Sequence, residues 1–359
     1  MATTLVKAAL SPLLTAPALL ALTVAPARIR EPILRYLREH VSNLTIKRAI
    51  TALQWLTALG LASRASAFMS ELAQNNFRFQ SERHRYNWPK EVAIITGAAS
   101  GFGALMSKSL AEKGVNIVAI DIKDELPADM RGNSKITYYR CDITDQSAVK
   151  ELAAQVKEAH GAASILINNA GVYFRDDILT VPSDKLHKTF NVNIISHYYM
   201  LQAFLPDMIK AKKGHVVSLA SMASFVGVPF FGTYTNTKAA VLNLHESLQR
   251  ETRVLHNTPE IKFTIVHPTF ADTPMVHTHQ GELDKLGVVP IPATMVTDAI
   301  VKQILSGRGR QIIVAPGLEW ISVLRALPHW FQTSLYMLEE RSDGKVMKEN
   351  HEEMKATQV

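Results

Sequence analysis

The order of apolar and polar stretches along this chain predicts an α/β protein built on a doubly wound parallel sheet of about seven strands. Short apolar runs that fit buried strands alternate with stretches of helical periodicity. The first run, residues 91–95, leads directly into a glycine-rich turn and then into a helical pattern. Two later runs end at Asp121 and at Asn169, polar residues placed where strands are expected to end.

Length and composition fit one large domain with extensions. The chain has 359 residues, of which 47% are hydrophobic and 20% charged. Its net charge of +7 comes mainly from basic residues in an apolar N-terminus, which favours a membrane surface over nucleic acid as a partner. Cys141 is the single cysteine, so an intrachain disulfide is excluded and a reducing compartment is favoured. No Cys and His spacing suggests a metal site.

These patterns predict five parts. They are a membrane-associating apolar segment (1–74), a polar linker (75–90), the sheet domain (91–316), an amphipathic C-terminal helix (317–338) and a charged, disordered tail (339–359).

The N-terminal segment begins with an uncharged run over residues 8–27, which is long enough to cross a bilayer but contains three prolines. A second apolar run, residues 49–62, fits an interfacial helix or half of a re-entrant hairpin. A membrane anchor is the favoured interpretation. A cleaved signal peptide, a mitochondrial presequence and a helical hairpin packed on the domain are the alternatives, and Glu31 and Glu39 weaken the presequence.

The glycine turn predicts a Rossmann-type dinucleotide site. Gly97 permits the tight turn, Gly101 lets the backbone approach a pyrophosphate, and Gly103 lets the helix lie close to the strand. Ser100 and Phe102 belong to the same turn. The N-terminus of the following helix then faces the phosphates.

Polar residues after the later strands complete this predicted site. Asp121 lies 24 residues after Gly97, near the position of an acid that binds ribose hydroxyls. Such a carboxylate repels a 2′-phosphate, so NAD is predicted over NADP, although Lys123 keeps NADP as the alternative. Asp142 is placed to contact adenine, and Asn169 is expected to shape the cofactor groove.

Tyr234 and Lys238 form the most distinctive pair in the second half. A spacing of four residues puts both side chains on one face of a helix. A cation beside a phenol favours the phenolate, so the pair predicts a tyrosine whose pKa is lowered toward the working range.

Taken in order, these motifs resemble the short-chain dehydrogenase/reductase family over about residues 89–315. The set comprises Thr-Gly-x-x-x-Gly-x-Gly, the acid after the second strand, Asn-Asn-Ala-Gly, a helix asparagine, a serine and Tyr-x-x-x-Lys. The stretches at 188–193, 203–208 and 214–221 are similar to the branch of retinol dehydrogenases and lipid-droplet 17β-hydroxysteroid dehydrogenases. That resemblance implies a membrane-associated oxidoreductase of the endoplasmic reticulum or lipid droplet, acting on a lipophilic alcohol or ketone as a homodimer.

The resemblance also assigns catalytic roles. Tyr234 is the acid/base, Lys238 binds the nicotinamide ribose, and Ser221 hydrogen-bonds the substrate oxygen. Ser221 lies thirteen residues before Tyr234, as the family pattern expects, and is preferred to Ser218 and Ser224. Asn193, rather than its neighbour at 191, is expected to hold a water that links the lysine to solvent.

Further residues are expected around the nicotinamide and the substrate. Thr273 matches the residue that contacts the carboxamide, whereas Thr269 replaces a glycine usual in the family. Phe225 and Phe230 are expected to line an apolar substrate pocket, with packing in the core as the alternative. Residues 274–292 are predicted to form a substrate lid. The two histidines of that lid, at 277 and 279, are interpreted as part of a solvated loop.

Three functions are compatible with these features. The leading hypothesis is an NAD-dependent dehydrogenase for a retinoid, steroid or other lipid alcohol. The alternatives are an NADPH-dependent reductase of a lipid ketone and a non-catalytic lipid-droplet or scaffold protein that keeps the fold. The complete set of Asn193, Ser221, Tyr234 and Lys238 argues against the last.

Overall fold

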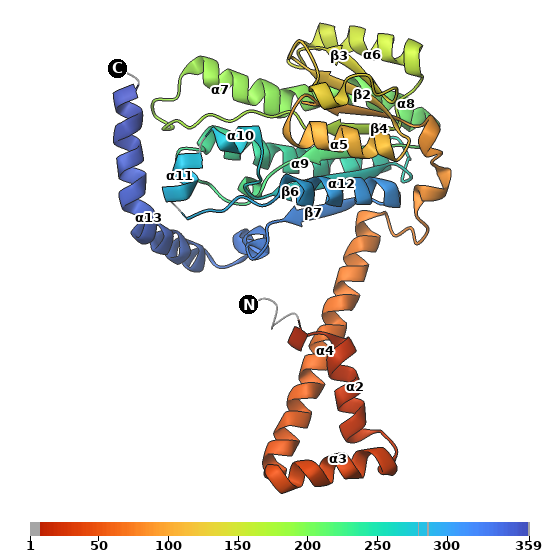
Figure 1. The fold of residues 1–359 in the computed structure, drawn as a ribbon, viewed down its shortest axis with the longest axis vertical. Helices are drawn as coiled ribbons and strands as arrows, with labels where there is room; N and C mark the ends of the chain where they lie inside the picture. The colour runs from red at the N-terminus through yellow and green to blue at the C-terminus, as the bar shows by residue number, and fades with distance from the viewer. Residues whose placement is uncertain (1–7, 279, 286, 358–359) are drawn as a thin grey trace. The chain divides into compact units, whose positions relative to one another are not determined.

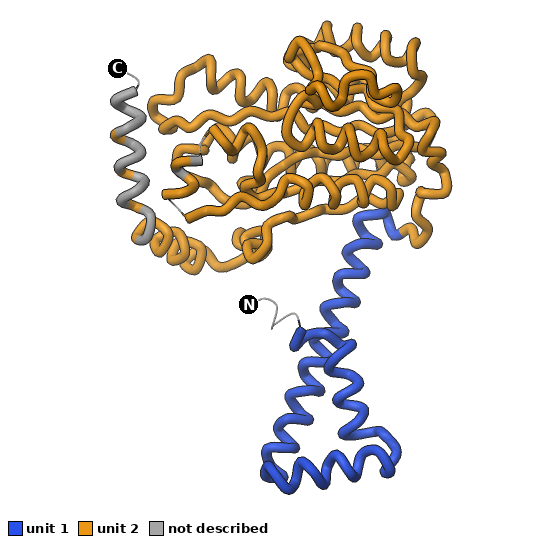
Figure 2. Tube along the Cα trace, in the orientation of Figure 1, with its two compact units in different colours: residues 1–77 blue, residues 78–359 orange. Residues whose placement is uncertain are grey.

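A computed structural model describes residues 8–278, 280–285 and 287–357, and the chain divides into two units, residues 1–77 and 78–359 (Figure 2). Each unit makes its own internal contacts, and each is described by itself below.

From residue 12 onward, unit 1 contains the helices α2 (Pro12–Thr23), α3 (Ala27–His40) and α4 (Asn43–Gln74). Helix α2 packs against α4, and α3 connects the C-terminal end of α2 to the N-terminal end of α4 (Figure 1). The packing depends on Gly60 of α4, because a Cβ atom there would lie 2.3 Å from the carbonyl oxygen of Leu10. Ser42 caps α4 by accepting a hydrogen bond of 3.2 Å from the Thr45 N–H.

Large apolar side chains lie on the outside of unit 1. Leu13 of α2 is 71% exposed and Trp55 of α4 is 67% exposed. In α3, the apolar Ile29 and Tyr36 lie on one side and Arg28 and Arg35 on the other, as in an amphipathic helix. Among the described residues, no single helix is long and apolar enough to span a membrane. Taken together, α2 and α3 are long and apolar enough to span a membrane by length and composition alone, but the pair is bent by 94°.

Unit 2 contains a seven-stranded parallel sheet with the strand order β3-β2-β1-β4-β5-β6-β7 (Figure 1). The strands are β1 (Val92–Thr96), β2 (Asn116–Asp121), β3 (Ile136–Arg140), β4 (Ile165–Asn168), β5 (His215–Leu219), β6 (Lys262–Pro268) and β7 (Arg310–Val314). The predicted doubly wound sheet is therefore confirmed. Because the strand order reverses between β1 and β4, their carboxyl ends open a crevice of the kind that binds ligands.

Helices cover both faces of this sheet. The longer ones are α5 (Gly101–Glu112), α6 (Gln146–His160), α8 (Ser196–Ala211), α9 (Gly232–Val254) and α12 (Ala293–Ser306). The remaining elements are η1 (Glu82–Arg85), η2 (Trp88–Lys90), η3 (Ala128–Met130), α7 (Ser183–Phe190), η4 (Asn191–Ile195), η5 (Met222–Ser224), α10 (Pro274–His277), α11 (Gln280–Lys285), η6 (Glu319–Ala326) and α13 (His329–Thr357).

Strand side chains alternate between two apolar cores. Ile95 packs with residues of α5 and α12, whereas Ile94 packs with residues of α6 and α8. Both isoleucines are fully buried, as expected for a parallel strand covered on both faces. This rigid layer fixes the position of every loop at the carboxyl edge of the sheet.

From residue 78 onward, the segment predicted as a linker over 75–90 belongs to unit 2. Glu82 is 3% exposed and pairs with Arg78 and Arg85, and its N–H donates to the Gly307 carbonyl oxygen at 3.1 Å. Near the C-terminus, Pro328 separates η6 from α13, and the boundary predicted at residue 338 falls inside α13.

Candidate active site

Ser221 and Tyr234 meet at the carboxyl edge of the sheet. Ser221 follows β5 and begins η5, where its Oγ accepts a hydrogen bond of 3.1 Å from the Ala223 N–H. Tyr234 lies in the first turn of α9, and the Ser221 hydroxyl beside its phenol acts to lower the pKa of that phenol. Two residues that are thirteen positions apart in the sequence therefore lie close together, as their spacing predicts.

Lys238 lies one turn after Tyr234 on the same face of α9. It is 4% exposed, and its Nζ donates to the Leu219 carbonyl oxygen at 2.7 Å and lies 5.5 Å from the centroid of the Tyr234 ring. The predicted i, i+4 pairing is therefore present, and the end of β5 holds the lysine in place.

The pKa values of this pair differ from the sequence expectation. Burial raises the pKa of Tyr234 to about 12, although its hydrogen bond to Ser221 acts in the opposite direction. Burial also lowers the pKa of Lys238 to about 8. Burial of the phenol therefore acts against the lowering of its pKa that was expected from Lys238.

Asn193 is fully buried in η4, a π-helical turn between α7 and α8. Its Oδ1 accepts from the Val172 N–H at 2.8 Å, and its Nδ2 donates to the Val172 carbonyl at 2.8 Å and to Thr237 Oγ1 at 3.1 Å. Both amide protons are therefore used, so the side chain braces the site and can offer a water only an acceptor position on Oδ1.

Gly171 lies beside both Asn193 and Lys238. A Cβ atom at Gly171 would lie 3.5 Å from Asn193 Oδ1 and 3.7 Å from Lys238 Nζ. The missing side chain leaves space next to the acceptor and the ammonium group, which is where the predicted water would have to lie.

The glycine turn fits a dinucleotide. A Cβ atom at Gly103 would lie 2.1 Å from the Gly97 carbonyl oxygen, so only glycine lets α5 approach β1 this closely. Gly101 has a φ of +52°, which glycine adopts without strain. Ser100 is the N-cap residue of α5 and makes no capping hydrogen bond. The ring of Phe102 is half-buried and packs against the core.

The acids and the asparagine of the predicted cofactor site lie after their strands. At the end of β2, the Asp121 carboxylate accepts from the Ala99 N–H at 2.9 Å and from the Lys123 N–H at 3.2 Å. Asn169 donates to the Thr96 carbonyl at 2.8 Å and so ties the end of β4 to β1. Asp142 is exposed after β3 and accepts from Thr144.

Thr273 connects the end of β6 to the same turn. It is 8% exposed, immediately precedes α10, and lies against Gly101, whose Cβ position is 3.7 Å from the threonine Cβ. Residues separated by more than 170 positions therefore form one wall. The glycine turn at 97–103, the Asp121 carboxylate after β2 and Thr273 together fit a nicotinamide dinucleotide.

The two phenylalanines predicted to bind substrate lie in different environments. Phe225 is 7% exposed, belongs to a small core with Met222 and Ala315, and lies against His267, with tilted rings whose centroids are 4.6 Å apart. Its side chain packs in this core, and its assignment to the substrate pocket stays a prediction. Phe230 is half-buried, has a φ of +65° and lies 5.1 Å from the Arg175 guanidinium.

Tyr173 is a site residue that the sequence analysis missed. Its ring lies 5.8 Å from the rings of both Tyr234 and Phe231, and its hydroxyl donates to the Met275 carbonyl at 3.2 Å. It therefore links Tyr234 to α10, which starts the predicted lid. Its place two residues after Asn-Asn-Ala-Gly was the available signal.

Of the two histidines in the predicted lid, the structure describes His277. His277 Nε2 lies 2.5 Å from Asp272 Oδ1, and no group of three or more metal-ligating residues occurs in the described part of the chain. His279 lies outside the described residues.

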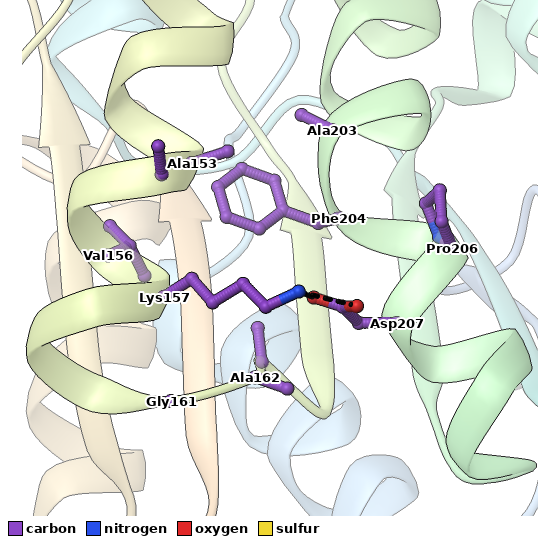
Figure 3. Close-up of a pocket in the computed structure, with 11 residues that line it drawn as sticks. Ala153, Val156, Lys157, Gly161, Ala162, Ala203, Phe204, Pro206 and Asp207 are labelled. Carbon is purple, nitrogen blue, oxygen red and sulfur yellow. Dashed lines mark hydrogen bonds and ion pairs between the residues drawn. The ribbon is translucent and has the colours of Figure 1, made fainter.

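A hollow of about 250 Å³ lies between α6 and α8, away from these groups (Figure 3). Figure 3 shows the Lys157 side chain crossing it to Asp207, with an Nζ–Oδ2 distance of 2.8 Å. Neither Ser221 nor Tyr234 lines it, so it is not the catalytic pocket.

Comparison with known proteins identifies relatives of this chain. Residues 91–283 match the family described as short chain dehydrogenase. Dehydrogenase RED2 of Cochliobolus heterostrophus is 34% identical over 213 residues, which cover 59% of this chain and 78% of that protein. Estradiol 17-beta-dehydrogenase 11 of Homo sapiens is 30% identical over 67% of this chain and 80% of its own length. Epidermal retinol dehydrogenase 2 of Mus musculus is 37% identical over 53% of this chain and 63% of its own length.

Solved structures show the same fold. A short-chain dehydrogenase/reductase from Burkholderia phymatum in complex with NAD superposes with a TM-score of 0.61 and 24% identity, covering 67% of this chain and 94% of that one. ElxO with NADP bound superposes with a TM-score of 0.55 and 22% identity, covering 62% of this chain and 96% of that one.

Proposed function

Because this chain belongs to the short-chain dehydrogenase family, and is thus a dehydrogenase of alcohols or ketones that uses NAD(P), we propose that it oxidises a lipophilic alcohol with NAD. The observation that carries this proposal is the meeting of the Ser221 hydroxyl, the Tyr234 phenol and the Lys238 ammonium group beside Gly171. A hydroxyl, a phenol and a cation in that arrangement are the groups needed to take a proton from an alcohol while a hydride leaves its carbon.

Each side chain has a separate task in this mechanism. Tyr234 accepts the alcohol proton, and Ser221 donates a hydrogen bond to the substrate oxygen while charge develops on it. Lys238 binds the nicotinamide ribose, and Asn193 braces η4 beside it. Bound NAD supplies the hydride acceptor and a positive charge on the nicotinamide. In the chain alone the Tyr234 pKa is about 12, so a further positive charge beside the phenol is needed to favour the phenolate.

The choice of NAD rests on Asp121. Its carboxylate lies at the end of β2 and accepts from an N–H of the glycine turn, where a ribose 2′-phosphate would meet a like charge. NADPH-dependent reduction of a ketone is the second candidate, because Lys123 lies two residues further on. Relatives of the fold have been solved with NAD and with NADP.

Two observations support a lipophilic substrate and a membrane location. Relatives are named for retinol and for estradiol, which are both apolar alcohols. Unit 1 exposes large apolar side chains on α2 and α4 and carries basic residues in α3. We place the enzyme on the endoplasmic reticulum or a lipid droplet, and we expect a homodimer in which α8 and α9 make the contact.

The test is the substitution Tyr234→Phe in the full chain, assayed with NAD and a panel of retinoid and steroid alcohols. We expect kcat to fall by about 10³-fold, because the phenol proton acceptor is lost while the ring remains. Tyr36→Phe is the matched control, since Tyr36 is 62% exposed on α3 of unit 1. Undiminished turnover in Tyr234→Phe contradicts the mechanism, and no turnover by the unaltered chain favours the scaffold alternative.

A further inference from the structure

A buried histidine lies directly behind Ser221. His267 is the penultimate residue of β6 and is fully buried, on the same face of the strand as Ile265. Its Nδ1 lies 3.0 Å from the main-chain carbonyl oxygen of Ser221. None of the roles described above uses this side chain.

The two ring nitrogens have complementary partners. A carbonyl oxygen only accepts, so Nδ1 of His267 carries the proton and donates it to Ser221. Nε2 then has a free lone pair, and the Gln311 amide nitrogen in β7 lies 3.3 Å from it as a donor. One neutral tautomer satisfies both contacts, so Gln311 selects the tautomer that Ser221 needs.

The protonation state agrees with this geometry. Burial lowers the pKa of His267 to about 4, the Ser221 carbonyl raises it and the nearby Lys238 lowers it. The ring is therefore neutral throughout the range in which a dehydrogenase is assayed, and the hydrogen bond does not change with pH there.

The held carbonyl belongs to the turn that aims the serine hydroxyl. The same Ser221 oxygen accepts from the Ser224 N–H at 3.0 Å, so the turn is fixed at both of its ends. Phe225 covers the imidazole, and its own carbonyl oxygen accepts from Arg325 Nε at 2.9 Å. Rotation of the Ser221 peptide would break the contact with His267 and move Oγ away from Tyr234.

We propose that His267 is a positioning residue for the dehydrogenase reaction: its Nδ1–H, oriented by Gln311, holds the main chain of Ser221 so that the serine hydroxyl stays against Tyr234. This inference rests on the proposed function. It assigns to the residue before Pro268 a part in catalysis that acts through the serine and not by contact with the substrate.

A buried histidine elsewhere in the sheet provides the matched control. His215 begins β5, is also fully buried, and places its Nε2 2.8 Å from Thr264 Oγ1. It lies at the opposite end of β5 from Ser221. Loss of His215 therefore costs stability of a similar kind without disturbing the serine.

The experiment compares Leu and Asn substitutions at both histidines in the full chain. His267→Leu removes the donor, and we expect kcat to fall by about 10- to 100-fold with an unchanged KM for NAD, because a small displacement of a reacting group is costly. Asn places its amide nitrogen near the position of Nδ1, so His267→Asn restores kcat to within about threefold of the unaltered chain. The substitutions at His215 lower the melting temperature but leave kcat within about twofold.

Three kinetic outcomes overturn the proposal. They are a kcat for His267→Leu within about twofold of the unaltered chain, an equal loss in His215→Leu, and no rescue by Asn relative to Leu. If His267→Leu does not fold, Gln311→Ala decides instead, because Gln311 is exposed on β7 and its loss leaves the core filled. We expect that variant to retain its melting temperature and to lose about threefold in kcat, and an unchanged kcat overturns the proposal.

A spectroscopic measurement separates this inference from the proposed function. In the chain labelled with ¹⁵N-histidine, the His267 signals, identified by their loss in His267→Asn, should report the Nδ1–H tautomer at pH 7 and a mixture of tautomers in Gln311→Ala. An Nε2–H or doubly protonated ring overturns the inference even in an active enzyme. If the Nδ1–H tautomer is found but no alcohol is oxidised, the proposed function has failed and the hydrogen bond has not.

Discussion

In unit 2 the strands β1, β4 and β5 are buried along their whole length, whereas in unit 1 large apolar residues of α2 and α4 lie on the outside. Leu13, Leu20 and Trp55 are each more than half exposed, and isoleucines of β1 are not exposed at all. Burying one such side chain stabilises a structure by about 1.5–3 kcal/mol. Unit 2 obtains this stabilisation by burying apolar side chains in its own sheet. The exposed apolar side chains of unit 1 would gain it in contact with another apolar phase, which we propose is lipid.

The comparison also separates two uses of tightly packed glycine. Gly103 lets α5 approach the cofactor turn in unit 2, and Gly60 lets α2 approach α4 in unit 1. The contact in unit 2 serves a ligand site, and the contact in unit 1 serves helix packing alone. The predictions below test that division of labour, beginning with the largest effect.

Alanine substitution at the two glycines should separate catalysis from anchoring. Gly103→Ala places a Cβ atom 2.1 Å from a carbonyl oxygen, so we expect NADH binding to weaken by at least about 10²-fold, measured by fluorescence titration. Gly60→Ala creates an equally severe contact of 2.3 Å but should leave the affinity for NADH within about twofold. Equal losses in both variants would show that unit 1 takes part in the cofactor site.

Replacing exposed leucines of α2 should release the protein from membranes. For Leu13→Ser, Leu14→Ser and Leu20→Ser combined, we expect the fraction that floats with anionic vesicles to fall by about tenfold or more, with kcat unchanged, because each change removes about 1 kcal/mol or more of apolar transfer energy. Val254→Ser with Leu255→Ser is the control, since both side chains are about as exposed but lie in unit 2. A larger effect of the control pair would assign membrane contact to unit 2.

Lys238→Met should stabilise unit 2 while abolishing turnover. Burial lowers the pKa of Lys238 from 10.5 to about 8, so between these values the unfolded chain binds more protons and stability rises with pH. Below pH 8 the folded protein carries the cost of a buried charge. Allowing for the lost hydrogen bond to Leu219, we expect a gain of about 2 kcal/mol at pH 7 from the methionine, measured by thermal denaturation without cofactor.

The pH dependence supplies the control for that variant. Lys262 has a pKa lowered to about 8 by burial, so it contributes a rise in stability over the same range. Lys238→Met should therefore weaken, and not remove, the increase in melting temperature between pH 8 and pH 10. An increase as steep as that of the unaltered chain would mean that the pKa of Lys238 is not lowered in the folded state.

Asp121→Ser should change the cofactor preference by the smallest amount. Removing the carboxylate ends the repulsion of a 2′-phosphate, and we expect the ratio of kcat/KM for NAD to that for NADP to fall by about tenfold, or about 1.4 kcal/mol. Asp142→Ser is the control, because Asp142 follows the neighbouring strand β3. A preference for NADP in the unaltered chain would favour the reductase candidate.

The sequence alone predicted the α/β architecture, because strand and helix periodicities are local and the glycine turn has one common structural context. It also predicted that Ser221, Tyr234, Lys238 and Asn193 belong together, since their order and spacing follow the chain. The structure brings these four into one place. Whether they act as assigned is left to the substitution at Tyr234.

Only the tertiary structure decided what surrounds those residues. Phe225 packs in a small core, where its ring lies against His267, a residue 42 positions away in the sequence. The pKa of Tyr234 is raised and not lowered because burial depends on every element packed around the phenol. Local periodicity carries no information about such long-range contacts, so the pairing of His267 with Ser221 could be found only in the folded chain.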